Sequence, residues 1–267
     1  MKRVLAIAYL MAACAAAKAG GYADFGAGID ANNRGEPERA AIHFSLALTA
    51  GDLPESYVPA ALLGRARAEL RLRRCDKARR DLDLAIARKP DFADAFSLRA
   101  EAQQCGGNSE AALADANRAV ILRPAAGYFF TRSRLEWNHG DLTAAHRDAE
   151  AAAAHDPGNA YFQLWASVTA AELKRSPQPA IPPHNGSGDW PGPLLDLFNG
   201  SAAPEQVWQA AGDDQGRACE ADFFVGAWFQ AQGRNADAKP LYARAAATCP
   251  RDFVAFEAAE SALKRLE

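Results

Sequence analysis

The sequence predicts an all-α fold in which antiparallel helix pairs stack along the chain. An alanine followed by a second alanine seven residues later and by a proline twelve residues later occurs four times, at Ala78/Ala85/Pro90, Ala112/Ala119/Pro124, Ala145/Ala152/Pro157 and Ala238/Ala245/Pro250. Because proline cannot donate the backbone hydrogen bond of a helix, each copy predicts one helix and its end. The first three copies recur at 34 and 33 residues, a period typical of solenoids of helical hairpins. The composition is also rich in alanine and has few runs typical of strands, which favours an all-α fold.

The first nineteen residues have the composition of a secretory signal. Lys2 and Arg3 precede an apolar run from Val4 to Ala17, and Ala17-Lys18-Ala19 has the A-x-A pattern of a cleavage site. The run is too short to cross a bilayer. We therefore expect residues 1–19 to be a signal peptide and the mature protein to be periplasmic or otherwise exported to a bacterial envelope.

An alternative processing site lies within the same segment. Met11-Ala12-Ala13-Cys14 resembles a bacterial lipobox, with methionine where leucine is usual. This resemblance makes Cys14 a lipidation candidate, and a lipid anchor is the one membrane attachment that the sequence predicts.

The charge of the chain argues against nucleic acid as a partner. Removal of residues 1–19 leaves 27 basic and 33 acidic side chains, a net charge of −6. Nucleic-acid phosphates select basic surfaces, so no nucleic acid is expected to bind.

A 34-residue frame with the recurring alanine at position 20 brings two further positions into register. Position 15, where the first helix should end and the chain turn back, favours left-handed backbone angles and holds Gly35, Arg73, Gly107, Gly140 and Gly233. Position 8, where the two helices should pack closely, is small throughout: Gly28, Ala66, Ala100, Ser133 and Gly226. The frame thus predicts a first helix, a turn and a second helix in each copy.

These units resemble tetratricopeptide (TPR) repeats, which have small residues at positions 8, 20 and 27 and proline at position 32. The resemblance predicts an N-terminal array over residues 20–175, with repeats at 21–54, 59–92, 93–125 and 126–159 and a half-repeat at 160–174. A Pro-rich linker at 176–193 should interrupt the solenoid. C-terminal helices over 194–267 should follow, containing a repeat at 219–252 and a capping helix, and Pro240 is expected to shorten or kink the second helix of that repeat.

Motifs in the second half narrow the resemblance. They are, in order, Tyr161-Phe162-Gln163-Leu164-Trp165, Trp190-Pro191, Phe198-Asn199-Gly200, Cys219-Glu220-Ala221, Phe224-Val225-Gly226 and Cys249-Pro250. Over nearly the whole mature chain this order resembles the TPR proteins related to the bacterial lipoprotein NlpI. The resemblance implies an envelope adaptor, lipid-anchored and dimeric in that family, that holds peptidoglycan hydrolases and a processing protease.

Four cysteines remain if Cys14 leaves with the signal, and in an oxidising compartment they allow two disulfides in three connectivities. Cys219 opens the first helix of the last repeat and Cys249 closes its second helix. Cys75 begins the second helix of repeat two, and Cys105 ends the first helix of repeat three. Because successive helices are antiparallel, the expected pairs are Cys219–Cys249 and Cys75–Cys105, with free buried thiols as the alternative.

The first helix of each repeat should supply the partner-binding face. Its positions 2, 5, 9, 12 and 13 line the concave side of a TPR array, and the aromatic and arginine side chains found there are types that contribute most to interfaces. The candidates are Tyr22, Phe25, Ile29, Leu63, Arg67, Leu70, Arg71, Phe130, Arg134 and Trp137. The alternative is that some of them pack into the core or against the linker.

Residues 65–89 form a basic segment within this acidic chain. They contain ten basic and four acidic side chains, a net charge of +6. The segment is a candidate site for an acidic partner or an anionic envelope polymer, and the alternative is a solvated helix surface.

The sequence predicts neither catalysis nor a cofactor. No G-x-S-x-G, P-loop or dinucleotide-binding motif occurs, and no two histidines have the i, i+4 spacing of a helical metal site. The leading hypothesis is a non-catalytic, exported TPR adaptor that binds a protein or peptide partner. The alternatives are a homodimeric assembly subunit and a peptidoglycan-related binder or hydrolase.

Overall fold

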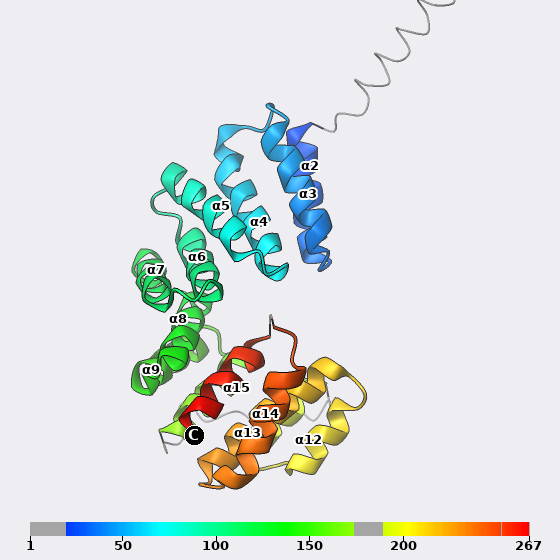
Figure 1. Cartoon of the computed structure of the whole chain (residues 1–267), viewed down its shortest axis with the longest axis vertical. Helices are drawn as coiled ribbons and strands as arrows, with labels where there is room; N and C mark the ends of the chain where they lie inside the picture. Colours follow the sequence, from blue (N-terminus) through cyan, green and yellow to red (C-terminus); the bar gives the residue numbers. More distant parts are fainter. Residues whose placement is uncertain (1–19, 174–188, 252, 267) are drawn as a thin grey trace, which may run out of the picture. The chain divides into compact units, whose positions relative to one another are not determined.

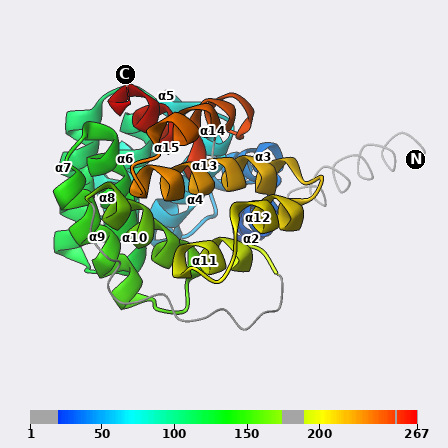
Figure 2. The ribbon, with the colours of Figure 1, turned by 90° about the horizontal axis from the view of Figure 1, so that it is seen from below.

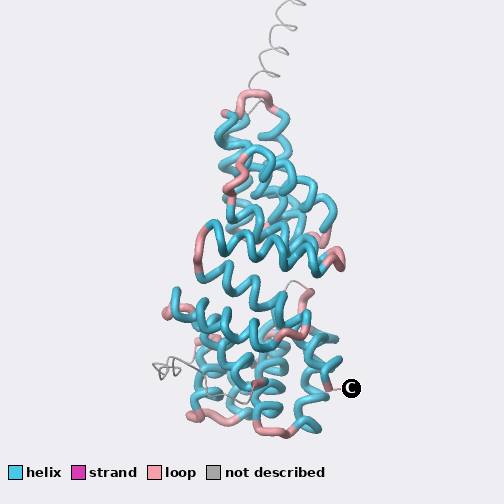
Figure 3. Tube along the Cα trace, turned by 90° about the vertical axis from the view of Figure 1, so that its left-hand side faces the viewer, coloured by secondary structure: helices cyan, strands magenta, loops and turns pink. Residues whose placement is uncertain are grey.

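The computed structural model describes residues 20–173, 189–251 and 253–266, and the regular elements in these ranges are all helices (Figures 1 and 3). They comprise 14 α-helices, one 3₁₀ helix and no strand, which confirms the all-α fold class. The expected signal peptide, Cys14 and most of the expected linker lie outside the described residues.

The chain divides into two compact units: unit 1 is Met1–Leu122 and unit 2 is Arg123–Glu267. The described part of unit 1 consists of three consecutive helical hairpins (Figure 1). These are α2 (Gly21–Asn33) with α3 (Pro37–Thr49), α4 (Val58–Arg71) with α5 (Cys75–Arg88), and α6 (Ala93–Cys105) with α7 (Ser109–Leu122). The 3₁₀ helix η1 (Glu55–Tyr57) leads into α4.

Unit 2 joins the fourth hairpin to the C-terminal helices. It contains α8 (Ala126–His139), α9 (Leu142–His155), α10 (Ala160–Glu172), α11 (Gly192–Asn199), α12 (Pro204–Ala211), α13 (Gln215–Ala231), α14 (Asn235–Thr248) and α15 (Val254–Arg265). α13 packs on α10, and α15 packs on α8, α13 and α14 (Figure 2). These contacts place the C-terminal helices in one unit with α8–α10.

The turn inside each hairpin has the backbone geometry that position 15 favours. Its residues have positive φ angles: 72° at Gly35, 79° at Gly107, 90° at Gly140, 73° at Gly233 and 57° at Arg73. Arg73 is the one non-glycine residue with positive φ in the described part of the chain. The turn therefore depends on the hairpin geometry as well as on glycine, since an L-residue rarely adopts this region.

Phe44 fills the space between the first two hairpins because two glycines leave room for its ring. The side chain is fully buried on α3. A Cβ atom at Gly28 would lie 3.0 Å from ring atoms of Phe44, and one at Gly64 would lie 2.7 Å from both Cε atoms of the same ring. Gly64 thus permits a contact between α3 and α4 that a larger residue would prevent.

We expect Gly64→Ala to lower the free energy of unfolding by about 1–3 kcal/mol, because the added methyl group overpacks the Phe44 site. This loss should exceed the gain of up to about 1 kcal/mol that alanine brings to a helix interior. Gly26→Ala on α2 is the matched control, since a Cβ there meets no atom within 4 Å. Urea denaturation followed by circular dichroism should show destabilisation by the first change alone, and equal stability of the two variants would contradict this packing.

Pro240 does not shorten α14, as the sequence allowed. The helix begins at Asn235 and continues through Pro240 to Thr248. The carbonyl group that loses its helical partner is that of Ala236, four residues earlier. Ala236 is exposed in the first turn, where water can satisfy its carbonyl group.

Candidate functional site

An arginine on the first helix pairs with an aspartate on the second helix in three successive hairpins. The pairs are Arg65–Asp81, Arg99–Asp115 and Arg132–Asp148, each 16 residues apart in the sequence. Each is bidentate, with N–O distances of 2.7 and 2.7 Å at Asp81 and of 2.6 and 2.8 Å at Asp115. The hydrogen bonds to these carboxylates raise the pKa of each arginine. These charges thus stabilise the hairpins internally.

These pairs are not among the residues predicted above, although their sequence signal is simple. In the 34-residue frame, arginine recurs at position 7 and aspartate at position 23 of repeats two to four. The last hairpin uses the reverse order, with Asp222 on α13 accepting 2.6 and 2.9 Å hydrogen bonds from Arg244 on α14.

The first-helix face of unit 1, which we define as the candidate residues of α2 and α4, is partly aromatic. Tyr22 is 59% exposed and Ile29 is 40% exposed, whereas Phe25 is buried beneath them. Tyr57, which is not among the predicted residues, joins them: its ring lies 5.2 Å from that of Tyr22 and 5.5 Å from that of Phe25. A hydrogen bond with Tyr22 raises the pKa of Tyr57. Phe25 is therefore the buried base of a cluster whose outer members are Tyr22 and Tyr57.

The α4 part of the same face carries both candidate arginines. Leu63 and Leu70 are half-buried, and Arg67 is exposed and has no ion pair among the described residues. Arg71 donates a 3.1 Å hydrogen bond to the Asn32 carbonyl oxygen at the end of α2. Arg71 thus helps join two hairpins, and Arg67 is the arginine of this face that stays open to a partner.

The corresponding candidates in unit 2 lie against the C-terminal helix of the chain. Trp137 is fully buried, and its Nε1 atom donates a 3.4 Å hydrogen bond to the Ala258 carbonyl oxygen on α15. The Arg265 guanidinium lies 4.2 Å from the Trp137 ring centroid. Arg134 approaches Glu257 at 3.8 Å. α15 thus occupies the part of α8 where the sequence suggested a partner.

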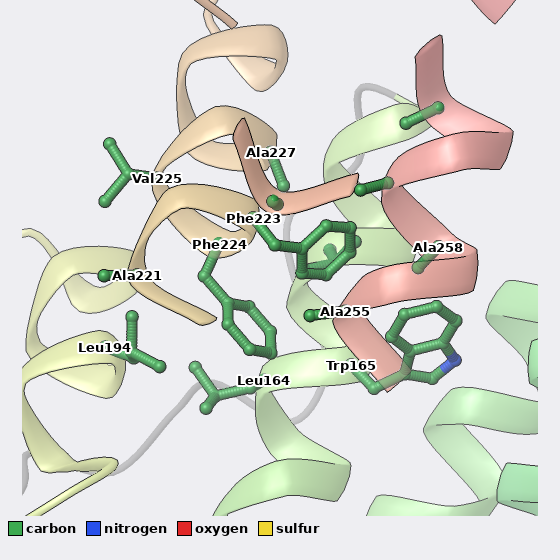
Figure 4. Close-up of a cluster of buried hydrophobic side chains, with 14 of the residues drawn as sticks. Leu164, Trp165, Leu194, Ala221, Phe223, Phe224, Val225, Ala227, Ala255 and Ala258 are labelled. Carbon is green, nitrogen blue, oxygen red and sulfur yellow. The ribbon is translucent and has the colours of Figure 1, made fainter. Parts of the chain in front are cut away.

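Phe130 belongs to the aromatic core of the same unit. Its ring centroid lies 5.1 Å from that of Phe162 and 6.1 Å from that of Trp165. The core continues through α10, α11, α13 and α15, where Figure 4 shows Leu164, Trp165, Leu194, Phe223, Phe224 and Ala258 gathered together. Trp137 is thus part of the core of unit 2 and Phe130 packs against it, whereas Arg134 is half-buried beside α15.

Three of the motifs behind the narrower resemblance meet at one carboxylate. Glu220 on α13 accepts a 2.7 Å hydrogen bond from the Trp190 indole and a 3.2 Å hydrogen bond from the Tyr161 hydroxyl. Burial raises the pKa of Glu220 and is the main cause that raises the pKa of Tyr161 to about 12. The cluster connects α10 and α13 with the segment that precedes α11, so its evident role is structural.

Both expected disulfides are present. Cys75 is bonded to Cys105, with a Cα–Cα distance of 5.9 Å, and Cys219 to Cys249, with a Cα–Cα distance of 5.1 Å. The first joins the start of α5 to the end of α6, and the second joins the two helices of the last hairpin. Each closes a loop across 30 residues and, in the chain-entropy model, stabilises the fold by about 3–4 kcal/mol. Such bonds are typical of an oxidising compartment.

The basic segment 65–89 separates into engaged and open side chains. Arg65 binds Asp81, Arg74 lies 3.3 Å from Glu69, and Arg79 lies 3.7 and 3.5 Å from two α5 aspartates. The ammonium group of Lys89 lies over the Phe92 ring, and Arg71 binds a backbone carbonyl. The basic side chains without a polar or aromatic partner among the described residues are Arg67, Arg73, Lys77, Arg80 and Arg88.

The described residues do not gather a metal site or supply a membrane span. In residues 20–173, 189–251 and 253–266 no three His, Cys, Asp or Glu side chains are placed to hold a metal ion. Across the same ranges no helix has both the length and the apolar character needed to cross a bilayer.

Solved structures show what this arrangement is similar to. A tetratricopeptide repeat protein from Parabacteroides merdae superposes with a TM-score of 0.53 at 16% identity, over 90% of this chain and 98% of that one. The fold is a TPR-like array of helical hairpins. A thermophilic TPR protein from Thermus thermophilus gives a TM-score of 0.48 at 17% identity, over 91% of this chain and 100% of that one. No family model and no curated protein matches the sequence.

Proposed function

We propose that this protein is a non-catalytic TPR scaffold of the bacterial envelope that binds a protein or peptide partner through the first-helix face of unit 1. The observation that carries the proposal is the contrast between the two sets of candidate residues. On α2, Tyr22 and Ile29 expose large apolar side chains, and Arg67 on α4 has no ion-pair partner among the described residues. On α8, Trp137 is covered by α15.

The residue types on this face suit a peptide partner. Tyrosine and arginine contribute more to protein interfaces than other exposed residues, because they combine large contact areas with directional hydrogen bonds. The buried Phe25 and its neighbour Tyr57 hold Tyr22 from below and beside it. A partner would therefore meet an apolar surface that is already ordered, which lowers the entropic cost of binding.

The envelope setting rests on the sequence and on the disulfides. The signal-like segment 1–19 favours export, and two disulfides fit an oxidising compartment. The resemblance to NlpI-related proteins makes peptidoglycan hydrolases or a processing protease the partners to test first. Lipidation at Cys14 is the corresponding proposal for membrane attachment.

The test compares two exposed isoleucines in the first hairpin. Immobilised wild-type mature protein, Ile29→Ala and Ile42→Ala are exposed to envelope extract, and the captured proteins are quantified by mass spectrometry. Ile29 lies on α2 at 40% exposure, and Ile42 lies on α3 at 58% exposure, so the control changes the same residue type on the other helix. We expect a set of proteins lost with Ile29→Ala and retained with Ile42→Ala, and equal capture by all three proteins would refute the proposal.

A further inference from the structure

A pocket in unit 1 lies away from the first-helix face. It has a volume of about 240 Å³ and opens between the end of α3, the start of α4 and the end of α5. None of the candidate residues of α2 and α4 lines it. Its lining includes Leu48, Leu53, Val58, Leu62, Leu84 and Arg88.

Six of the ten lining residues of this pocket are apolar, and the others include the charged side chains of Glu55, Arg65 and Arg88. Leu48, Leu53 and Val58 are half-buried around it, and Leu62 is buried at 4% exposure. Leu84 on α5 is 48% exposed at its edge. The pocket therefore offers a partly apolar site of a size suited to one large side chain, next to a leucine that is open to solvent.

Two arginines and one glutamate line the pocket, and one of the two arginines is already paired. The Arg65 guanidinium is engaged by Asp81 and by a 3.2 Å hydrogen bond to the Ser45 hydroxyl group. Arg88 is exposed and has no ion pair among the described residues. Glu55 is the one acidic side chain in the lining.

A stripe along α5 extends this positive charge. Arg80, Leu84 and Arg88 are spaced by four residues, and Lys77 precedes Arg80 by three, so these exposed side chains share one side of the helix. None of the three basic side chains pairs with a described acidic residue. Arg80 and Arg88 are thus free to bind a partner on either side of the exposed Leu84.

We propose that the α3–α5 pocket binds an acidic segment of a protein partner through one large apolar side chain flanked by carboxylates. The apolar side chain enters between Leu48 and Leu84, and the carboxylates pair with Arg88 and Arg80. An anionic polysaccharide would also meet the cations but would leave the apolar walls without a partner. The combination of apolar side chains in the pocket with open arginines beside it therefore favours an acidic peptide.

Fluorescence anisotropy with two labelled hexapeptides tests this proposal. The probe is Glu-Glu-Leu-Phe-Glu-Glu and its counterpart is Lys-Lys-Leu-Phe-Lys-Lys, both with blocked ends. We expect the acidic peptide to bind with a Kd below about 1 mM and the basic peptide to bind at least tenfold more weakly. Binding of both peptides with equal affinity, or binding of neither, would overturn the proposal.

Three variants locate the binding. Leu84→Asp and Arg88→Glu should each weaken the acidic peptide by tenfold or more. Arg118→Glu, a matched charge reversal at an exposed position of α7, should change its affinity less than threefold. Because all three side chains are exposed, the variants should keep the wild-type melting curve by circular dichroism.

Competition with heparin tests whether this surface recognises negative charge alone. The proposal is wrong if heparin displaces the peptide and if Leu84→Asp changes neither the affinity for heparin nor the affinity for the peptide. The surface would then recognise charge alone. Because the α2 face does not line the pocket, failure here leaves the capture experiment with Ile29 and Ile42 unaffected.

Discussion

Replacing Trp137 by alanine is expected to lower the free energy of unfolding by about 3–5 kcal/mol, the usual loss for a buried tryptophan in a core. The side chain extends from α8, is fully buried against α15, and has the Arg265 guanidinium over its ring. Its removal would leave a cavity and would take away the ring that the Arg265 guanidinium covers, although Glu172 would still hold Arg265 at 3.0 Å. Urea denaturation monitored by circular dichroism measures the loss.

Trp228 provides the matched control for this change. It lies on α13 and is only half-buried, so Trp228→Ala should cost clearly less. If Trp137→Ala cost no more than Trp228→Ala, α15 would not hold Trp137 as described, and the α8 face would return as a candidate partner site.

The second large effect is a pH dependence of stability that arises from Glu136. This carboxyl group is buried on α8, and its Oε2 atom has no hydrogen-bond partner. Burial, with a further contribution from the Asp148 carboxylate, raises the pKa of Glu136 from 4.5 to about 7. The folded state thus favours the protonated form, although Arg132 lies 3.9 Å away.

The raised pKa of Glu136 decides how stability changes with pH. Below about pH 4.5 the group is protonated in both states and costs nothing. As the pH rises toward 7 the unfolded state ionises first, so the free energy of unfolding falls, by on the order of 3 kcal/mol in total. We expect Glu136→Gln to remove this part of the decline and to be more stable than wild type at pH 8.

Stability measured by urea denaturation between pH 4 and pH 8 tests the Glu136 prediction. Glu260→Gln on the exposed side of α15 is the control and should follow the wild-type curve. A Glu136→Gln curve parallel to that of wild type would show that Glu136 does not titrate in the folded state as we expect.

The hairpins were predictable from the sequence because their signals are local. The alanine positions, the turn residue at position 15 and the proline stops all lie within one repeat, and Gly107 and Gly140 adopt the expected turn geometry. The cysteine pairs were predictable for a related reason, since antiparallel neighbours bring helix ends such as those at Cys219 and Cys249 together.

The contact of α15 with α8 could not be predicted in the same way. More than 100 residues separate Trp137 from Ala258, whose side chains follow no shared period. The packing depends on how α13 and α14 return the chain to α10, which no repeat pattern specifies. For that reason the sequence placed Trp137 on a partner-binding face, whereas the structure buries it.

The pairing of charges escaped prediction for a different reason. Arg65 and Asp81 were counted with the basic segment and the solvated helix surfaces, because net charge does not reveal which charges face each other. The 16-residue spacing between position 7 and position 23 carries that information, but only once the two helices are known to pack side by side. The net charge of residues 65–89 therefore overstates the number of basic side chains that are free to bind a partner.

The central claim, that the first-helix face of unit 1 is the partner-binding surface, is tested most directly by site-specific photo-crosslinking in cells. A photoreactive amino acid is introduced separately at Ile29 on α2, at Ile42 on α3 and at Phe130 on α8. We predict that position 29 yields a crosslinked complex with another protein, and that positions 42 and 130 do not. Crosslinked complexes at position 42 or 130, with none at position 29, would contradict the claim.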